Sequence, residues 1–298
     1  MRGFNGVLFL VAVILAAVAF FEPGIKQATE LPPLTSLQPH QVQHLVFGRP
    51  GREMAQAVKT DRWTLQAPFA APADSYRINA LLALAQTPSL SHYPLAGVDL
   101  AQLQLDPPQL VVELNNTRLE LGGTEPLRGQ RYVRVGETIH LIDDRLYFTG
   151  NPVELVDPTL LPGEPSLVAI SLPALPPPLG DGTPLVAELV EGRWQTDPSL
   201  VDLSADVLPT LVDGWRRMRA LDVRQDPASD PEAISADALP QVLIRLAGGE
   251  TIVFEVTSQR GEVILRRPAW QLRYVVSRGM ALELLSIGGG GTLTGESP

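Results

Sequence analysis

Four histidines are the side chains best suited to metal binding or acid–base chemistry in this chain. His40 and His44, in the stretch HQVQH, stand four residues apart, so on a helix both would face one way and hold a metal ion. Pro39 precedes them, however, and the neighbourhood is typical of a tether or a strand. No glutamate lies between them to act as a general base. We therefore expect neither a metal nor a cofactor in this protein.

His140 lies close to Asp143 and Asp144, which suggests a general base with a carboxylate to orient it. On a strand, His140 and Asp143 would point to opposite faces. The chain also has no cysteine, no P-loop, no GxGxxG stretch, no HExxH stretch and no serine in a nucleophile-elbow motif. We therefore expect no catalytic residues and predict that the protein is not an enzyme.

A repeated Arg-Trp dipeptide supplies the candidates for a binding groove. DRWTLQAPFAAPAD at residues 61–74 resembles GRWQTDPSLVDLSAD at residues 192–206, with Arg62-Trp63 and Arg193-Trp194 131 positions apart. We predict that each Arg-Trp closes a strand just before a helix, where tryptophan covers the helix–sheet junction. The alternative is that Arg62 and Arg193 line a ligand groove.

The residues around the first Arg-Trp predict a strand pair, a helix and a meander. Asp74 is the expected N-cap of an amphipathic helix, since Ile78, Leu81, Leu82 and Ala85 follow at helical spacing. Turn signals rich in asparagine and glycine separate the segments that follow. The predicted strands are residues 42–47, 53–63, 109–114, 117–123, 130–137 and 138–143.

The second half of the chain predicts the same order of elements. Asp206 is the expected N-cap of a helix that places Leu208, Leu211, Trp215 and Met218 on one face. The predicted strands are residues 184–194, 241–249, 251–258, 262–267 and 272–278. The predicted fold class is α+β, with two tandem repeats that each have an antiparallel sheet and one amphipathic helix. The expected units are a first repeat at 44–158, a linker at 159–166, a second repeat at 167–287 and a flexible tail at 288–298.

The N-terminus predicts where the protein resides. Phe4 to Phe21 carry no charge and are long enough for a transmembrane helix, with Arg2 before them and Glu22 after them. We expect residues 1–24 to be a single-pass anchor in a bacterial inner membrane and residues 25–43 to be a tether, with the body in the periplasm. The alternative is a signal peptide cleaved at Ala17-Val18-Ala19. The net charge of −10 excludes a nucleic-acid partner that binds through a basic surface.

The anchor, RWTLQAPFAAPAD at 62–74, the leucine-rich helix and VVELNNTRLELGGTEPLRGQRYVRVGETIHLID at 111–143 resemble a bacterial family of membrane-anchored proteins, the domain of unknown function 4340 family. This resemblance implies an auxiliary extracytoplasmic part of a gliding-type ABC transport system, and it brings no catalytic residues.

The expected function is therefore a non-enzymatic, membrane-anchored interaction or accessory module of an envelope or ABC-type transport system, with a protein partner. The alternative is an envelope hydrolase that acts on glycan or peptide through paired carboxylates. The chain has 33 acidic residues, and the sequence does not say which of them meet in space.

Overall fold

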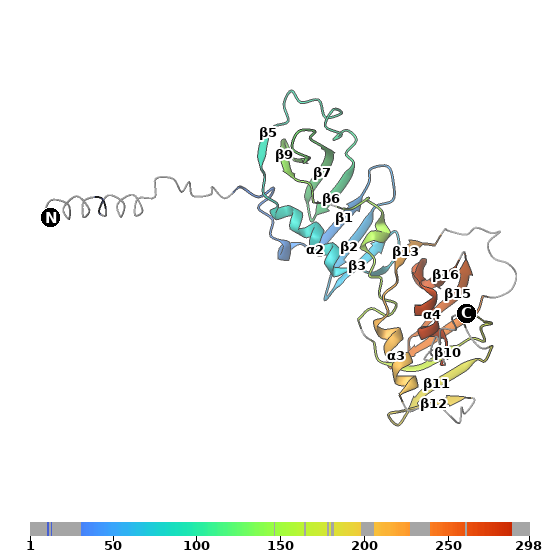
Figure 1. The fold of residues 1–298 in the computed structure, drawn as a ribbon. Coiled ribbons are helices and arrows are strands. Elements are labelled where there is room, and N and C mark those ends of the chain that lie inside the picture. The colour runs from blue at the N-terminus through green and yellow to red at the C-terminus, as the bar shows by residue number, and fades with distance from the viewer. Residues whose placement is uncertain are drawn as a thin grey trace, which may run out of the picture.

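The computed structural model describes residues 31–145, 147–163, 165–177, 179, 182–197, 206–226, 239–259 and 261–287, together with Val11 and Val13 (Figure 1). The rest of the expected anchor and the tail at 288–298 lie outside the described residues, as do parts of the expected tether and linker. None of the helices described here is long and apolar enough to cross a membrane.

In the described part of the chain, the first sheet has nine strands, and each strand pairs antiparallel with its neighbours. Their order across the sheet is β4-β3-β2-β1-β6-β7-β8-β9-β5. The strands are β1 (His44–Gly48), β2 (Ala55–Lys59), β3 (Trp63–Ala67), β4 (Ala71–Pro72), β5 (Ser91–Pro94), β6 (Leu110–Leu114), β7 (Thr117–Thr124), β8 (Gln130–Val135) and β9 (Thr138–Asp143).

The second sheet has eight strands, again antiparallel, in the order β12-β11-β10-β14-β15-β16-β17-β13. With the two-residue β4 set aside, this order matches that of the first sheet, strand for strand along the chain. The strands are β10 (Leu167–Leu172), β11 (Leu185–Val190), β12 (Arg193–Asp197), β13 (Asp222–Gln225), β14 (Gln241–Leu246), β15 (Thr251–Gln259), β16 (Glu262–Arg267) and β17 (Leu272–Val276).

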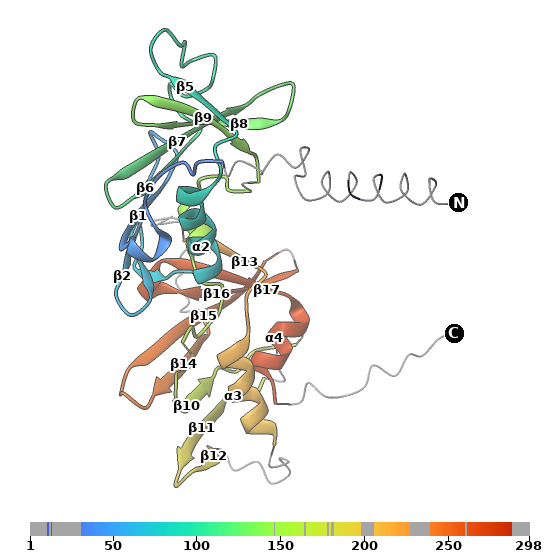
Figure 2. The same ribbon diagram turned by 90° about the vertical axis from the view of Figure 1, so that its left-hand side faces the viewer.

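Among the described residues, three α-helices accompany the sheets, and they lie along one side of the molecule (Figure 2). We call the first sheet with its helix the first unit, and the second sheet with its helices the second unit. The described fold is therefore a sheet-rich α+β fold with two antiparallel sheets, as predicted. The helices are α2 (Ser75–Ala83), α3 (Val207–Arg217) and α4 (Arg278–Leu285), with 3-10 helices η1 (Pro39–Gln41), η2 (Leu84–Gln86), η3 (Pro152–Leu155) and η4 (Pro268–Trp270).

The sequence predicts an Arg-Trp dipeptide at the end of a strand in each unit. In the structure, each dipeptide instead stands at the start of a strand. Trp63 opens β3 and Arg193 opens β12, each after a hairpin turn from the preceding strand. In the second unit the turn is Glu191-Gly192, with φ of 50° and 79°. Two adjacent residues with positive φ give the turn that joins two antiparallel strands tightly. The single strands predicted at 53–63 and 184–194 are therefore two hairpins.

Asp74 caps α2 as predicted. Its carboxylate accepts hydrogen bonds from the Tyr76 and Arg77 amides, and its backbone is extended, as in most N-caps. Asp206 does not play this part in α3, because its backbone is already helical (φ −95°, ψ −13°) and its side chain does not cap the first turn.

The buried faces of the two helices explain the difference. The buried residues of α3 are Leu208, Leu211, Val212 and Trp215, which stand 130 positions after Ile78, Leu81, Leu82 and Ala85. Asp74 and Asp206, the two predicted N-caps, are instead 132 positions apart. Burial of the apolar face sets the rotation of the helix, so Asp206 occupies the place of Tyr76.

Residues 155–161 connect the units and pair with both of them. On one side, the Asp74 amide donates to the Leu155 carbonyl at 2.8 Å, and Ala73 bridges to Val156. On the other side, Leu160 donates to the Met218 carbonyl at 3.0 Å, and Thr159 bridges to Arg219. Leu155, Val156, Leu160 and Leu161 are all buried, so the start of the predicted linker belongs to the core.

We expect Asp74→Ala to destabilise the protein by about 1–2 kcal/mol, because the variant loses the α2 cap and the ion pair with Arg219. Arg219→Gln removes only that ion pair, whose arginine is 59% exposed. We expect this control to cost less than about 1 kcal/mol in urea unfolding. Equal losses for the two variants would contradict the capping role.

Candidate functional site

The four predicted groove or junction residues lie on two different sheets. Trp63 is buried in the core, and Trp194 is half-buried against it. Arg62 is exposed, with its guanidinium against Gly163, and Arg193 is exposed at the hairpin turn. Since β3 and β12 belong to separate sheets, the Arg-Trp pairs do not form one site.

We expect Trp63→Ala to cost about 3–5 kcal/mol of unfolding free energy, the usual loss for a large core side chain. Trp194→Ala should cost about half as much or less, since less of its surface leaves water on folding. Chemical denaturation of both variants tests the difference. A larger loss at Trp194 than at Trp63 would contradict this burial assignment.

The histidines take structural positions. His40 lies in η1 and His44 in β1. His140 on β9 lies opposite His92 on β5, and its Nδ1 is 2.9 Å from the hydroxyl of the buried Ser89. Within the described ranges, no group of three or more histidine and acidic side chains could hold a metal ion.

Burial and the neighbouring His92 both lower the pKa of His140. The unfolded chain therefore takes up a proton before the folded chain does, so His140 should reduce stability as the pH falls below about 6.5. We expect the native protein to lose more unfolding free energy between about pH 7.5 and pH 5.5 than His140→Gln, by at most about 1.4 kcal/mol per pH unit. Parallel pH profiles of the two proteins would contradict this role.

The first unit has a cleft of about 1030 Å³ between α2 and the segment that follows β9. We call it the α2 cleft. Tyr76 and Tyr147 are its most exposed aromatic residues, at 83% and 92%. The residues that line it are Leu31, Asp74, Tyr76, Arg77, Ala80, Ala83, Leu84, Thr87, Pro88, Leu90, Ile142, Asp143, Arg145, Tyr147, Phe148 and Arg219.

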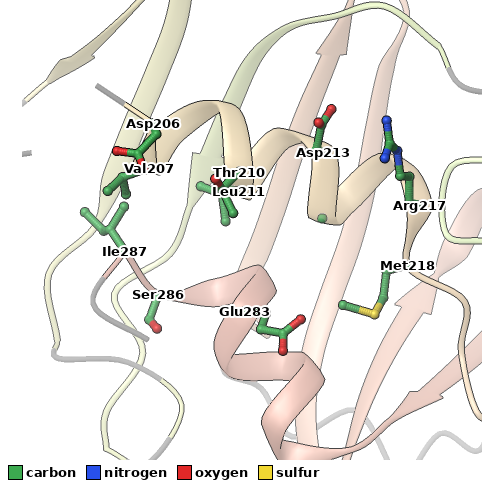
Figure 3. Close-up of a pocket in the computed structure, with 11 residues that line it drawn as sticks. Asp206, Val207, Thr210, Leu211, Asp213, Arg217, Met218, Glu283, Ser286 and Ile287 are labelled. Atoms are coloured by element: carbon green, nitrogen blue, oxygen red, sulfur yellow. The ribbon is translucent and has the colours of Figure 1, made fainter. Parts of the chain in front are cut away.

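The second unit has a groove of about 670 Å³ between α3 and α4. We call it the α3–α4 groove. Val207 and Ile287 lie at one end of it, and Met218 and Glu283 lie toward the other (Figure 3). The residues that line it are Asp206, Val207, Thr210, Leu211, Asp213, Gly214, Arg217, Met218, Glu283, Ser286 and Ile287.

The two hollows occupy equivalent places in their units. At the 130-residue offset of the buried helix faces, Tyr76, Arg77, Ala80, Ala83, Leu84, Thr87 and Pro88 correspond to Asp206, Val207, Thr210, Asp213, Gly214, Arg217 and Met218. All fourteen of these residues line one hollow or the other. In the first unit the opposite wall comes from the end of β9 and the chain after it, and in the second unit it comes from α4 and the residues after it. The described structure therefore has a hollow beside the equivalent helix face in each unit.

The side chains differ in charge between the two hollows. Arginines outnumber acids in the α2 cleft, where Arg77, Arg145 and Arg219 face Asp74 and Asp143. Asp74 is held by the α2 cap and by Arg219, and Asp143 pairs with Arg145 at 3.5 Å. Both carboxylates therefore already have a partner within the protein. Acids outnumber arginines in the α3–α4 groove.

Sequence reasoning missed two buried charges, Asp226 and Arg267, and Arg267 on β16 is the one that contacts the connection between the units. Its guanidinium lies 3.1 Å from the ring centre of Trp270, and it donates to the Leu160 carbonyl at 3.2 Å. Burial lowers its pKa to about 10 and raises the pKa of its neighbour Tyr274. Side chains alternate between the two faces of β16, so Arg267 points to the same face as the buried Val263 and Leu265. This alternation is the sequence signal that could have predicted its burial. The contact with Leu160 holds the connection between the units.

A family model described as Domain of unknown function (DUF4340) matches residues 63–238. The chain belongs to this family. The match runs from β3 to the residues before β14, so it includes both α2 and α3. No curated protein and no solved structure matches the chain.

Proposed function

We propose that this DUF4340 protein is a non-enzymatic interaction module, anchored in a bacterial inner membrane, that binds a protein partner of an envelope or ABC-type transport system. The duplicated hollow is the observation that carries the proposal. Both copies combine apolar walls with charged side chains, which suits recognition of a polypeptide segment. We propose further that residues 44–158 and 167–287 are two copies of one unit.

The anchor in this proposal is the uncharged stretch from Phe4 to Phe21. Residues 22–30 separate it from Leu31, which lines the α2 cleft. Nine residues span at most about 30 Å when fully extended. The anchor would thus keep the α2 cleft near the membrane surface, within reach of a membrane-embedded transport protein, with the body in the periplasm.

The hydrolase alternative requires two carboxylates that face one cleft and remain available to a substrate. The α2 cleft offers Asp74 and Asp143, and the contacts of both support a structural role instead. The α3–α4 groove offers Asp206, Asp213 and Glu283, and Asp213 pairs with Arg216 at 3.8 Å. The apolar walls that accompany the charges in both hollows favour the interaction module.

A photo-reactive amino acid in place of Tyr147, at the exposed rim of the α2 cleft, tests the proposal in living cells. We expect light to produce a specific adduct with a membrane transport protein. The matched control replaces Glu137, in the exposed turn between β8 and β9.

A reporter that is active only in the periplasm, fused after Pro298, checks the topology of the same protein. An inactive reporter, or the same adducts from both positions, would overturn the proposal. A purified protein that begins at Phe20 would overturn the retained anchor alone.

A further inference from the structure

We propose that the α3–α4 groove binds a basic, apolar segment of a partner protein. This inference rests on the proposed function and adds the chemistry of one partner segment. It assigns a separate ligand to the second of the two equivalent hollows. The first hollow, the α2 cleft, serves as a built-in comparison, because seven of its lining positions correspond to lining positions of the groove and carry different charges.

Apolar side chains supply the groove's walls. Val207 and Leu211 come from α3, Met218 lies at its end, and Ile287 follows α4. Val207, Met218 and Ile287 are only partly buried, so they keep surface that a ligand can cover. Apolar surface removed from water contributes about 25 cal/mol per Å². A bound segment must therefore be apolar on the side that enters the groove.

Acidic side chains determine the charge that the segment should carry. Asp206 and Asp213 come from the start and middle of the α3 segment, and Glu283 comes from α4 on the opposite wall. Arg217 is the basic residue among the lining residues described. Asp213 is exposed and pairs with Arg216 at 3.8 Å, whereas Glu283 is exposed on the opposite wall, so a lysine or arginine of the ligand can reach Glu283 without a large desolvation cost. The groove is therefore complementary to a cationic segment.

The comparison with the α2 cleft shows that the helix does not dictate this charge. Tyr76, Arg77 and Ala83 stand in the first unit where Asp206, Val207 and Asp213 stand in the second. The four buried positions of α3 correspond to three in α2 and one in η2, so these substitutions lie on the face that the core leaves free. The second unit thus carries one carboxylate just before α3 and one on α3, at places where α2 has an aromatic ring and a methyl group.

Binding of a short synthetic peptide of alternating leucine and lysine tests this assignment. The full chain is placed in zwitterionic lipid nanodiscs, and the labelled peptide is followed by fluorescence anisotropy. We expect saturable binding that weakens as salt rises, since exposed ion pairs are screened. Glu283→Gln should weaken binding about threefold to fivefold, the range of one exposed ion pair. Glu137→Gln, the control with the same change in net charge, should bind as the native chain does.

A charge reversal makes the test specific to the groove. Glu283→Lys should weaken the leucine–lysine peptide further and strengthen the matching leucine–glutamate peptide. Position 283 is exposed on the surface of α4, so Glu283→Lys is expected to fold, and circular dichroism checks this.

Equal binding of the lysine peptide to the native chain and to both Glu283 variants would overturn the proposal. So would binding that appears only after residues 288–298 are removed, because the chain's own tail would then be the occupant. Binding to empty nanodiscs alone would assign the peptide to lipid and would also overturn it. None of these outcomes affects the adduct expected at Tyr147, so the proposed function can stand if this inference fails.

Discussion

The paired connection at residues 155–161 is the constraint on which the arrangement of the two units depends. Its backbone completes hydrogen bonds with the start of α2 on one side and with the segment after α3 on the other. The guanidinium of Arg267 donates a hydrogen bond to the Leu160 carbonyl and packs against the Trp270 ring. A buried arginine costs free energy unless its donors and ring contacts are satisfied. The connection supplies one of those partners, so packing within the second unit and docking of the first are coupled.

Local patterns were enough to predict most elements of the sheets and the first helix. Asp74 was identified as a cap because its side chain and the apolar spacing after it act within two turns of one helix. The hairpins were missed for an equally local reason. Glu191-Gly192 lies inside a run of strand-forming residues, and the positive φ of Glu191 is unusual for a residue with a side chain. Its turn is therefore decided by the antiparallel pairing of β11 with β12.

The candidate site could not be predicted in the same way. Its walls come from one helix and from a segment more than sixty residues later in the chain, so neither wall shows a pattern of its own. The Arg-Trp repeat points to strand starts that line neither hollow. The informative signal was the spacing of the buried helix residues. These residues are 130 positions apart between the two units, whereas Asp74 and Asp206 are 132 positions apart.

This two-residue difference changes which side chains are equivalent. An alignment through the aspartates makes Asp206 a second helix cap and leaves no relation between the two hollows. An alignment through the buried faces places Asp206 where Tyr76 stands, at the mouth of an equivalent hollow. Core burial is worth several kcal/mol per large side chain, whereas a cap contributes about 1 kcal/mol. When the two conflict, burial determines the rotation of the helix. The aspartate is then directed to the groove, and a residue type that suits a cap becomes part of a binding surface.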